Sequence, residues 1–337
     1  MQPVFPPALN PGDTIGVAAP SGVVKRRRVE RAISRLQQAG FQVKTYGDLY
    51  RSRGYLAGDD QTRASELMSA FTDPEVRAVF PARGGYGIAR LLHRLDYDQI
   101  RRQPKIVTGF SDITALHLAL QRHCNLVTFH SPNLMDGLGA VNGLGTLAER
   151  SYWRALRADD YQATSEQNDQ PGKSLGHTGY ALLESDSPGT LEMGVLETVQ
   201  PGQAEGRIVG GNLALIASTL GTPYEIDTTD RLLFLEDIGE PPYRIDRYLA
   251  QLQLAGKLDP LTGVILGHFT NCQPAEREKS LSLDEVMADY LAPLNIPVVR
   301  NFPAGHEMPN LTLPLGVLAR LDADKGSLEL LENPVTL

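Results

Sequence analysis

Short hydrophobic runs alternate with amphipathic segments along the first 130 residues. The runs have the length of buried strands and cover residues 14–19, 41–45, 76–80, 105–107 and 127–130. Between them, apolar residues recur at helical spacing in residues 26–39, 59–71 and 88–95, and from residue 112 onward. Strands and helices that alternate at this spacing predict an α/β domain, a mostly parallel sheet with helices on both faces.

The pattern changes after residue 157. Residues 158–190 are rich in Asp, Gln, Ser, Gly and Pro and show little periodicity, which indicates a linker or an inserted segment. Beyond them, strands are expected at 206–209, 232–235, 263–266, 298–299, 313–319 and 327–331, with helices at 213–220 and 243–255. We therefore predict an N-terminal α/β domain in residues 1–157 and a mixed, β-rich α+β domain in residues 191–337.

Composition limits the partners that this chain can have. The net charge of -8 argues against nucleic acid or an anionic membrane surface. Cys124 and Cys272 form no CxxC pattern, so neither a disulfide framework nor a zinc site is expected. The first residues lack the features of a signal peptide, and no apolar stretch approaches the roughly 20 residues of a membrane helix. The sequence predicts a soluble, cytoplasmic protein.

Ser111 lies where a buried strand turns sharply into a helix. Residues 108–110 form the turn, and the helical pattern begins at Asp112. In open α/β sheets, ligands bind outside the carboxyl ends of the strands, so a hydroxyl at this point is exposed to a ligand. The free N–H groups of the first helical turn can receive negative charge. A purely structural alternative is that Ser111 is only the helix N-cap, with Asp112 favouring the helix dipole.

A glycine-rich segment follows the preceding strand. Arg83-Gly84-Gly85-Tyr86-Gly87 has three glycines in four positions, which lets backbone N–H groups approach a ligand closely. The segment is neither a GxGxxG dinucleotide motif nor a P-loop. Beside Ser111 it is a candidate source of oxyanion-hole donors, although a glycine turn at a strand end can also be only a turn.

The second half of the chain carries a pair of carboxylates and a loop histidine. Glu236 and Asp237 end an apolar strand, and their side chains leave the strand on opposite faces, so that one should point inward. His306 lies on a loop between strands, from which an imidazole can act as a general base. His130 and His268 each follow an apolar strand, which is more typical of structural histidines.

These residues can together form a serine nucleophile system. A serine that attacks a carbonyl needs a base, a carboxylate that fixes the imidazole tautomer, and backbone donors for the oxyanion. Ser111, His306 and Glu236 can supply the side chains, and the N–H groups of Gly85 and Asp112 can supply the donors. The chain order Ser, Glu, His is that of α/β-hydrolases, whereas the local Gly-Phe-Ser-Asp motif differs from GxSxG.

The motifs resemble those of peptidase family S66, the LD-carboxypeptidases or muramoyltetrapeptide carboxypeptidases. The segments that carry the resemblance are Pro11-Gly12-Asp13-Thr14-Ile15, Ala18-Ala19-Pro20-Ser21, Arg83-Gly84-Gly85-Tyr86-Gly87, Gly109-Phe110-Ser111-Asp112, Gly210-Gly211-Asn212-Leu213, Leu235-Glu236-Asp237, Pro242-Tyr243-Arg244-Ile245-Asp246-Arg247 and Gly305-His306. They follow the order of the family over nearly the whole chain, and residues 158–190 look longer than the usual linker. The resemblance places the nucleophile on Ser111, the glutamate on Glu236 and the general base on His306.

The resemblance implies a fold and a reaction. The fold would be a flavodoxin-like N-terminal domain with the serine and a C-terminal β-rich domain with the glutamate and histidine, in a homodimer that needs no metal or other cofactor. The reaction would be hydrolysis of the amide between a diamino acid and terminal D-alanine in murein tetrapeptides, through an acyl-enzyme on Ser111, in cell-wall recycling. Arg83 and Tyr86 are candidate substrate contacts. For Arg83 the reason is that a guanidinium suits a free carboxylate. A structural ion pair is the alternative for Arg83.

Three other functions are alternatives for this sequence. The immunity branch of the same family cleaves peptidyl or aminoacyl nucleotides of the microcin C type, and a nucleobase-stacking aromatic would favour it. The only tryptophan, Trp153, is expected in the core instead. A non-catalytic small-molecule-binding protein would not need Ser111, Glu236 and His306 together. A class I glutaminase uses a cysteine nucleophile, and neither cysteine stands at a strand–helix turn.

Overall fold

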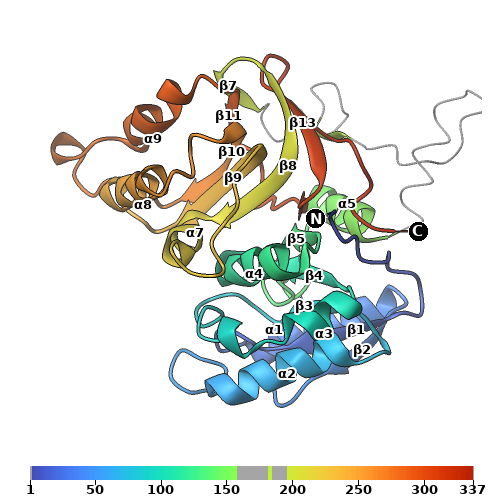
Figure 1. Ribbon diagram of the computed structural model, residues 1–337. Helices are drawn as coiled ribbons and strands as arrows, with labels where there is room; N and C mark the ends of the chain where they lie inside the picture. The colour runs from blue at the N-terminus through green and yellow to red at the C-terminus, as the bar shows by residue number, and fades with distance from the viewer. Residues whose placement is uncertain (1, 158–180, 184–195, 337) are drawn as a thin grey trace, which may run out of the picture. The chain divides into compact units, whose positions relative to one another are not determined.

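The computed structural model describes residues 2–157, 181–183 and 196–336 (Figure 1). The described chain divides into two compact units. The first contains the residues up to 157 together with 311–314 and 334–336, and the second contains 181–183, 196–310 and 315–333. The expected linker at 158–190 lies outside the described residues, apart from the short strand β6 (Ala181–Leu183).

The first unit is built on a largely parallel six-stranded sheet. Its strands are β1 (Thr14–Ala18), β2 (Gln42–Thr45), β3 (Val76–Pro81), β4 (Ile106–Gly109), β5 (Thr128–His130) and β12 (Leu313–Leu315). They lie in the order β12-β5-β4-β3-β1-β2, and β1 to β5 pair in parallel. This is the 2-1-3-4-5 order of flavodoxin-like sheets, in which ligands bind at the carboxyl ends of β1 and β3. The predicted fold class is confirmed.

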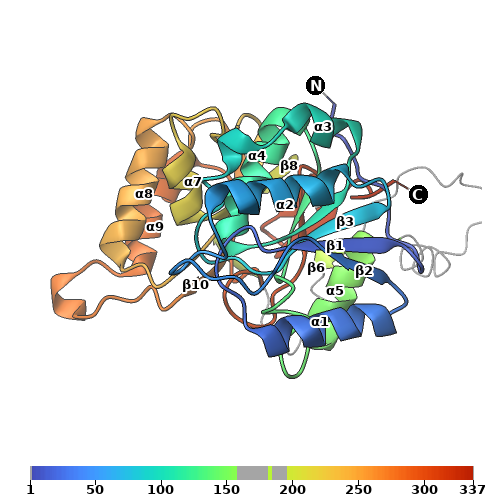
Figure 2. The same ribbon diagram turned by 90° about the horizontal axis from the view of Figure 1, so that it is seen from below.

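Helices cover both faces of this sheet, with α1 and α5 on one side and α2 and α3 on the other (Figure 2). Their bounds are α1 (Arg26–Gln38), α2 (Asp60–Thr72), α3 (Tyr97–Arg102), α4 (Thr114–Cys124) and α5 (Thr146–Leu156). Helix α1 buries Val29, Ala32 and Leu36, which share one helical face, against the core. Helix α2 begins at an N-cap, where the side chain of Asp59 accepts a hydrogen bond from the backbone N–H of Thr62 at 2.8 Å.

One expected helix is wrong. The helical pattern of residues 88–95 gives only a short 3-10 helix, η1 (Leu92–Arg94). The N–H group of Ile88 donates to the carboxylate of Asp112, and the carbonyl of Gly87 accepts from Arg63. These contacts tie the start of the segment to side chains from other parts of the chain.

The second unit is built on an eight-stranded mixed sheet. Besides β6, its strands are β7 (Glu197–Gln200), β8 (Gln203–Asn212), β9 (Arg231–Ile238), β10 (Leu261–Thr270), β11 (Val298–Arg300), β13 (Leu318–Asp322) and β14 (Ser327–Leu330). The order is β6-β14-β13-β8-β9-β10-β11-β7. The central strands β8 to β11 are parallel, and the flanking strands pair antiparallel. This agrees with the predicted mixed character of the second half.

Three helices connect the central parallel strands of the second unit. They are α7 (Leu213–Thr219), α8 (Pro242–Leu254) and α9 (Leu283–Leu291), with short 3-10 helices η4 (Arg277–Lys279) and η5 (Ala292–Leu294) beside α9. Right-handed crossovers between strands in sequential order place their helices on the same face. Because β8, β9 and β10 are parallel, their carboxyl ends meet at one edge of the sheet. This edge carries Asn212, Glu236 and His268.

Several details of the second half differ from the sequence prediction, and strand β7 was not predicted. Helix α9 was not predicted, although Ser282 and Glu285 form a capping box at its start. The strand expected at 313–319 is two strands in two different sheets, because Gly316 separates β12 from β13 with a φ of +92°.

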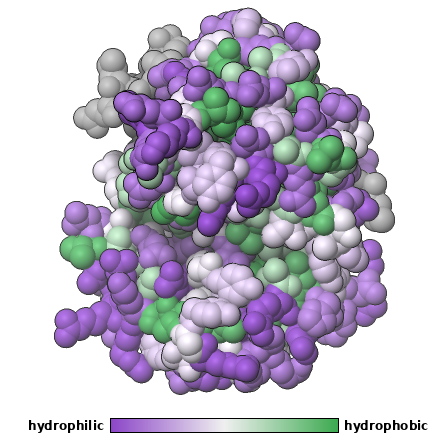
Figure 3. Space-filling model, turned by 90° about the vertical axis from the view of Figure 1, so that its left-hand side faces the viewer, coloured by the Kyte–Doolittle hydropathy of each residue, from purple (hydrophilic) through white to green (hydrophobic). Residues whose placement is uncertain are grey.

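The surface gives no sign of a membrane span. Among the described residues, no helix has the length and apolar content that a span requires. The face drawn in Figure 3 carries hydrophilic side chains over most of its area, with hydrophobic ones scattered among them. Single exposed apolar side chains of this kind are normal for a folded protein in water.

Candidate functional site

Ser111 occupies a strained turn at the carboxyl end of β4. Its φ is +63°, a left-handed conformation that costs a non-glycine residue about 1–2 kcal/mol. The short helix η2 (Ser111–Ile113) starts at this residue and leads into α4. The N-cap position of η2 belongs to Phe110, no side chain caps it, and the Ser111 hydroxyl makes no hydrogen bond within the described part of the first unit. The N-cap interpretation of Ser111 is therefore wrong, and strain of this kind is typical of functional sites.

Buried polar groups hold the turn before Ser111. The N–H group of Gly109 donates to the Ser131 hydroxyl at 3.1 Å, and that of Phe110 donates to Asn133 Oδ1 at 3.3 Å. The Gly109 carbonyl accepts from the Ser131 N–H group at 3.1 Å and contacts His117 Nε2 at 2.8 Å. Burial lowers the pKa of His117 to about 4, so the neutral ring donates its Nε2–H to this carbonyl.

The glycine-rich segment packs directly against this turn. A Cβ atom on Gly84 would lie 3.1 Å from both the Phe110 carbonyl oxygen and Ser111 Cβ, so only glycine leaves room here. The carbonyl of Gly84 accepts a hydrogen bond from the Gly22 N–H group at 3.2 Å. Gly85 follows with a φ of +115°. The turn after β1, the glycine segment after β3 and the serine turn after β4 thus lie together at one edge of the sheet.

Asp112 joins these segments through its side chain. The residue is buried, and its carboxylate accepts hydrogen bonds from the Ser21 hydroxyl and from the Ile88 N–H group, the latter at 3.0 Å. Burial raises the pKa of this carboxyl, and the hydrogen bonds that it accepts oppose the rise. The sequence identified Asp112 as a backbone donor and as a charge that favours the helix dipole, and did not predict the hydrogen bonds of its carboxylate to Ser21 and Ile88.

Arg83 and Tyr86 lie on the glycine segment with different surroundings. Arg83 Nη1 donates to the Val23 carbonyl at 2.9 Å, and Arg83 makes no ion pair with the described residues. The alternative of a structural ion pair is therefore not found in the described part of the chain. The Tyr86 side chain is 53% exposed, and its ring packs edge-on against that of Tyr55 with 5.4 Å between ring centroids.

Glu236 and His306 are brought together in the second unit. His306 Nδ1 lies 2.7 Å from Glu236 Oε2. Glu236 is fully buried at the end of β9, and its Oε1 atom has no partner among the described residues. Gly305 brings the histidine loop close, because a Cβ atom there would lie 3.0 Å from Glu236 Oε2. A buried carboxylate in this position accepts the Nδ1 proton, so that Nε2 is the ring nitrogen that can act as a base.

Asp237 has a structural environment. Its carboxylate accepts hydrogen bonds from Asn212 Nδ2 at 3.0 Å and from the N–H groups of Ala214 and Ile238 at 2.9 and 2.8 Å. Burial raises its pKa to about 6. Asn212 in turn caps α7 by accepting from the Leu215 N–H group at 3.1 Å. Of the two acids that end β9, Glu236 therefore meets the imidazole, and Asp237 holds the start of a helix.

The rival histidines have different environments. His130 packs edge-on against Phe110, with 5.9 Å between ring centroids. His268 lies on β10 beside the Glu236–His306 pair, and a Cβ atom on Gly305 would meet its Cβ at 3.2 Å. Burial lowers the pKa of His268, so the ring is neutral near pH 7.

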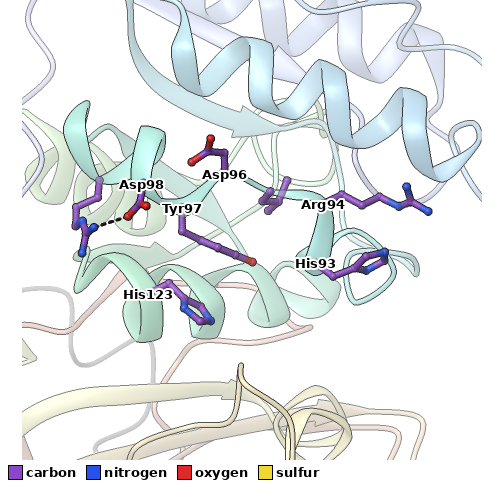
Figure 4. Close-up of a pocket in the computed structure, with 8 residues that line it drawn as sticks. His93, Arg94, Asp96, Tyr97, Asp98 and His123 are labelled. Atoms are coloured by element: carbon purple, nitrogen blue, oxygen red, sulfur yellow. Dashed lines mark hydrogen bonds and ion pairs between the residues drawn. The ribbon is translucent and has the colours of Figure 1, made fainter.

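A surface cavity of about 610 Å³ lies at the far end of α4 (Figure 4). It is lined by His93, Arg94, Leu95, Asp96, Tyr97, Asp98, Arg101 and His123. Asp98 pairs with Arg101, and the Tyr97 ring stacks on His123 with 4.6 Å between centroids. His123 is in the last turn of α4, about 14 Å along the helix from the end that follows Ser111. None of the candidate site residues lines this cavity.

The described residues offer no resident metal centre. They contain no group of three or more His, Cys, Asp or Glu side chains that could hold a metal ion. The side chains assembled near Ser111 and around His306 are instead those of acid–base and nucleophilic chemistry. Ser111 belongs to the first unit, and the Glu236–His306 pair belongs to the second.

Comparisons with known proteins match both halves of the chain. The family model described as the LD-carboxypeptidase N-terminal domain matches residues 15–131, and the one described as the LD-carboxypeptidase C-terminal domain matches residues 205–321. A protein named "probable murein peptide carboxypeptidase" from Bacillus subtilis (strain 168) is 40% identical over 317 residues, which cover 94% of this chain and 91% of the relative.

Solved structures agree with these matches. The structure of the microcin C7 self immunity protein MccF in the wild-type apo state has a TM-score of 0.84 at 27% identity, and the match covers 99% of this chain and 100% of that one. MccF from Escherichia coli is also 29% identical in sequence over 98% of this chain and 97% of its own length. The muramoyltetrapeptide carboxypeptidase from Oxalobacter formigenes has a TM-score of 0.73 at 30% identity, with 94% of this chain and 97% of that one covered.

Proposed function

Since the chain belongs to the LD-carboxypeptidases of peptidase family S66 and is a peptidase, we propose that it is a serine carboxypeptidase for murein tetrapeptides. Its substrate is the amide between the L-centre of a diamino acid and a terminal D-alanine. The single observation that carries the proposal is the strained turn at Ser111 beside a glycine-rich segment at the carboxyl edge of a flavodoxin-like sheet, with a hydroxyl that no described residue of the first unit binds.

The reaction proceeds through an acyl-enzyme. Ser111 Oγ attacks the carbonyl carbon of the scissile amide while His306 Nε2 takes the hydroxyl proton. Glu236 supports this step, because it accepts the Nδ1 proton of His306 at 2.7 Å and stabilises the imidazolium. The N–H groups of Gly85 and Asp112 stabilise the oxyanion. His306 passes its proton to the leaving amine, D-alanine departs, and water then hydrolyses the ester with His306 as base.

Arg83 is the proposed partner of the terminal carboxylate. It lies on the glycine segment, it makes no ion pair with the described residues, and a guanidinium binds a carboxylate through two parallel hydrogen bonds. Tyr86, exposed on the same segment, is the second proposed substrate contact.

The test incubates the protein with a tetrapeptide that contains meso-diaminopimelate. Mass spectrometry monitors the release of D-alanine. Wild-type protein is expected to release D-alanine, and Ser111→Ala is expected to release none while keeping the same thermal unfolding temperature. An active Ser111→Ala variant would contradict the nucleophile assignment. A wild-type protein that leaves the tetrapeptide intact would contradict the substrate.

A second candidate function is cleavage of an aminoacyl nucleotide. The MccF structure has the higher TM-score of the two neighbours, and other MccF structures contain aspartyl sulfamoyl adenosine or glutamyl sulfamoyl guanosine. The only tryptophan of this chain does not favour a nucleotide, because Trp153 is buried in the first unit and stacks on Phe41 with 5.4 Å between ring centroids. Aspartyl sulfamoyl adenosine, offered in the same assay, separates the two functions.

A further inference from the structure

One peptide unit of the glycine segment is held at both ends by buried charged side chains. The carbonyl of Gly87 accepts a hydrogen bond from Arg63 Nη1 at 3.2 Å. The N–H group of Ile88, which belongs to the same peptide plane, donates to Asp112 Oδ2 at 3.0 Å. Because a peptide unit is planar and rigid, these two contacts fix both its position and its orientation.

The same two side chains also hold the turn after β1. Arg63 Nη1 donates to the Pro20 carbonyl, and the Ser21 hydroxyl donates to Asp112 Oδ2. A guanidinium and a carboxylate therefore join two loops at the carboxyl edge of the sheet, each side chain contacting both loops. We call this arrangement of Arg63 and Asp112 the loop clamp.

Both charges of the loop clamp are buried. The Arg63 side chain has no solvent exposure, and Asp112 is 2% exposed. Charges in such positions are unfavourable by several kcal/mol each unless they are paired and hydrogen-bonded. Arg63 has one carboxylate partner, Asp60 at 2.7 Å, and its other hydrogen bonds go to the two loop carbonyls. Two buried charges of this kind indicate that the loops need a fixed geometry.

The segment has little freedom around the clamp. A Cβ atom on Gly87 would lie 2.7 Å from both Arg63 Nη1 and a methyl group of Leu56, so the backbone is packed tightly against the guanidinium. Gly85 lies two residues before Gly87, and a Cβ atom there would lie 3.4 Å from Gly22 Cα. Gly85 therefore lies between the clamped Gly87–Ile88 peptide and Gly84, whose carbonyl accepts from the Gly22 N–H group.

We propose that Arg63 and Asp112 are positioning residues that hold the Gly85 N–H group in place before the oxyanion forms. The inference rests on the proposed function, in which Gly85 is an oxyanion donor. Donors that are fixed in advance stabilise the transition state without reorganisation. A misplacement of about 1 Å at such a site lowers the rate by about 100-fold.

The test compares Arg63→Met and Asp112→Asn with a matched control, Arg90→Met. Arg90 binds the same Asp60 carboxylate as Arg63, at 2.8 and 3.0 Å, and makes no hydrogen bond to either loop. Arg63→Met and Asp112→Asn are expected to lower kcat for D-alanine release by about 100-fold, with KM changed by less than about threefold. Arg90→Met is expected to keep kcat within about twofold, because it leaves both loop contacts intact.

Two further variants separate positioning from folding. Arg63→Lys is expected to recover part of kcat, because an ammonium group can still donate to one loop carbonyl. Ser21→Ala removes only the hydroxyl that donates to Asp112, and we expect it to lower kcat by about tenfold at an unchanged unfolding temperature. If Arg63→Met does not fold, this small truncation still tests whether the contacts of Asp112 affect kcat.

Diisopropyl fluorophosphate makes the result independent of the peptide substrate. Ser111 Oγ forms a bond to phosphorus, fluoride leaves, and the hydroxyl proton passes to the base, so the rate of inactivation reports the nucleophile and its oxyanion donors alone. If wild-type protein is inactivated but releases no D-alanine, the proposed substrate fails, and the loop clamp is judged on inactivation rates. The loop clamp would then be supported if the inactivation rate falls strongly in Arg63→Met and Asp112→Asn, less in Ser21→Ala, and hardly in Arg90→Met.

Two results would overturn the loop clamp. The first is a failure of the comparison between variants. Arg63→Met and Asp112→Asn would then react at the wild-type rate, in D-alanine release or in inactivation, or Arg90→Met would lose as much kcat as they do. The second is a wild-type protein that is inert to both reagents, which would remove the oxyanion and with it both proposals.

Discussion

His117 should make the first unit sensitive to acid. The ring is fully buried, and its Nε2–H group holds the Gly109 carbonyl at 2.8 Å, two residues before Ser111. Burial lowers its pKa from 6.5 to about 4, so the unfolded chain takes up the proton first as the pH falls. Stability is therefore lost as the pH falls from about 6.5 to about 4. At 1.36 kcal/mol for each pKa unit, the loss is about 3 kcal/mol.

His117→Gln isolates this effect. An amide can still donate to the Gly109 carbonyl, but it does not titrate, so the variant should lack the acid-dependent loss. Urea unfolding at pH 7 and at pH 4 can follow the first unit through Trp153, the only tryptophan, which is buried in that unit. We expect the wild type to lose about 3 kcal/mol more than the variant between the two pH values, whereas the other groups cancel in the comparison.

Equal pH dependence in the two proteins would refute this reasoning. It would mean that His117 takes up a proton at the same pH in the folded and unfolded states, and so that the Gly109 carbonyl and the surrounding core do not hold a neutral ring. A direct measurement of the His117 titration by NMR gives the same decision, because a pKa near 6.5 in the folded protein leaves no linkage to stability.

Three further predictions concern the serine turn and the acids of β9. Ser111→Gly should unfold at a higher temperature than Ser111→Ala, by about 1 kcal/mol in stability, because glycine adopts a φ of +63° without strain. Equal stability of the two variants would show that the turn is unstrained. Glu236→Gln should lower kcat by a factor on the order of 10³ to 10⁴ with an unchanged KM, since an amide no longer stabilises the His306 imidazolium. A loss below tenfold would contradict that role. Asp237→Asn should remove a rise in stability of about 3 kcal/mol as the pH falls from about 6 to about 4, because a pKa raised to about 6 lets the folded state bind the proton first. Hydrogen exchange of the β9 amides measures it, and an unchanged pH dependence would contradict the burial of this charge.

The positions of the first five strands along the chain and the candidate residues followed from local patterns, whereas the order of the strands in the sheet did not. A short apolar run predicts a strand, and the residue that ends it lies at a sheet edge where ligands bind. This is why Ser111, Glu236 and the glycine segment could be selected from the sequence. Residue types alone suggested Glu236 as the partner of His306, and the family resemblance supported this choice. Local patterns could not show that the two side chains meet, because 70 residues separate them.

Features that depend on distant contacts were missed. Arg63 lies in the run Asp-Gln-Thr-Arg at the start of α2, which resembles a solvated helix face, yet its side chain is fully buried against two loops. Strand β12, near the C-terminal end of the chain, joins the first sheet, and no periodicity in the sequence predicts that pairing. His117 could have been found, because it lies four residues after Ile113 on the apolar face of α4 and is polar among mostly apolar neighbours.

The residues that break local rules in the first unit converge on the serine turn. Ser111 adopts a conformation that disfavours it, His117 is a neutral histidine in the core, and Arg63 and Asp112 are buried charges. Each is unfavourable alone, and the burial of His117, Arg63 and Asp112 is offset by hydrogen bonds to the backbone around Ser111 or to the glycine segment. A fold that needed only stability would gain by replacing them with apolar residues. Their concentration at one edge of one sheet is what a preorganised nucleophile and its oxyanion donors require, because rigidity there must be built into the protein before the substrate arrives.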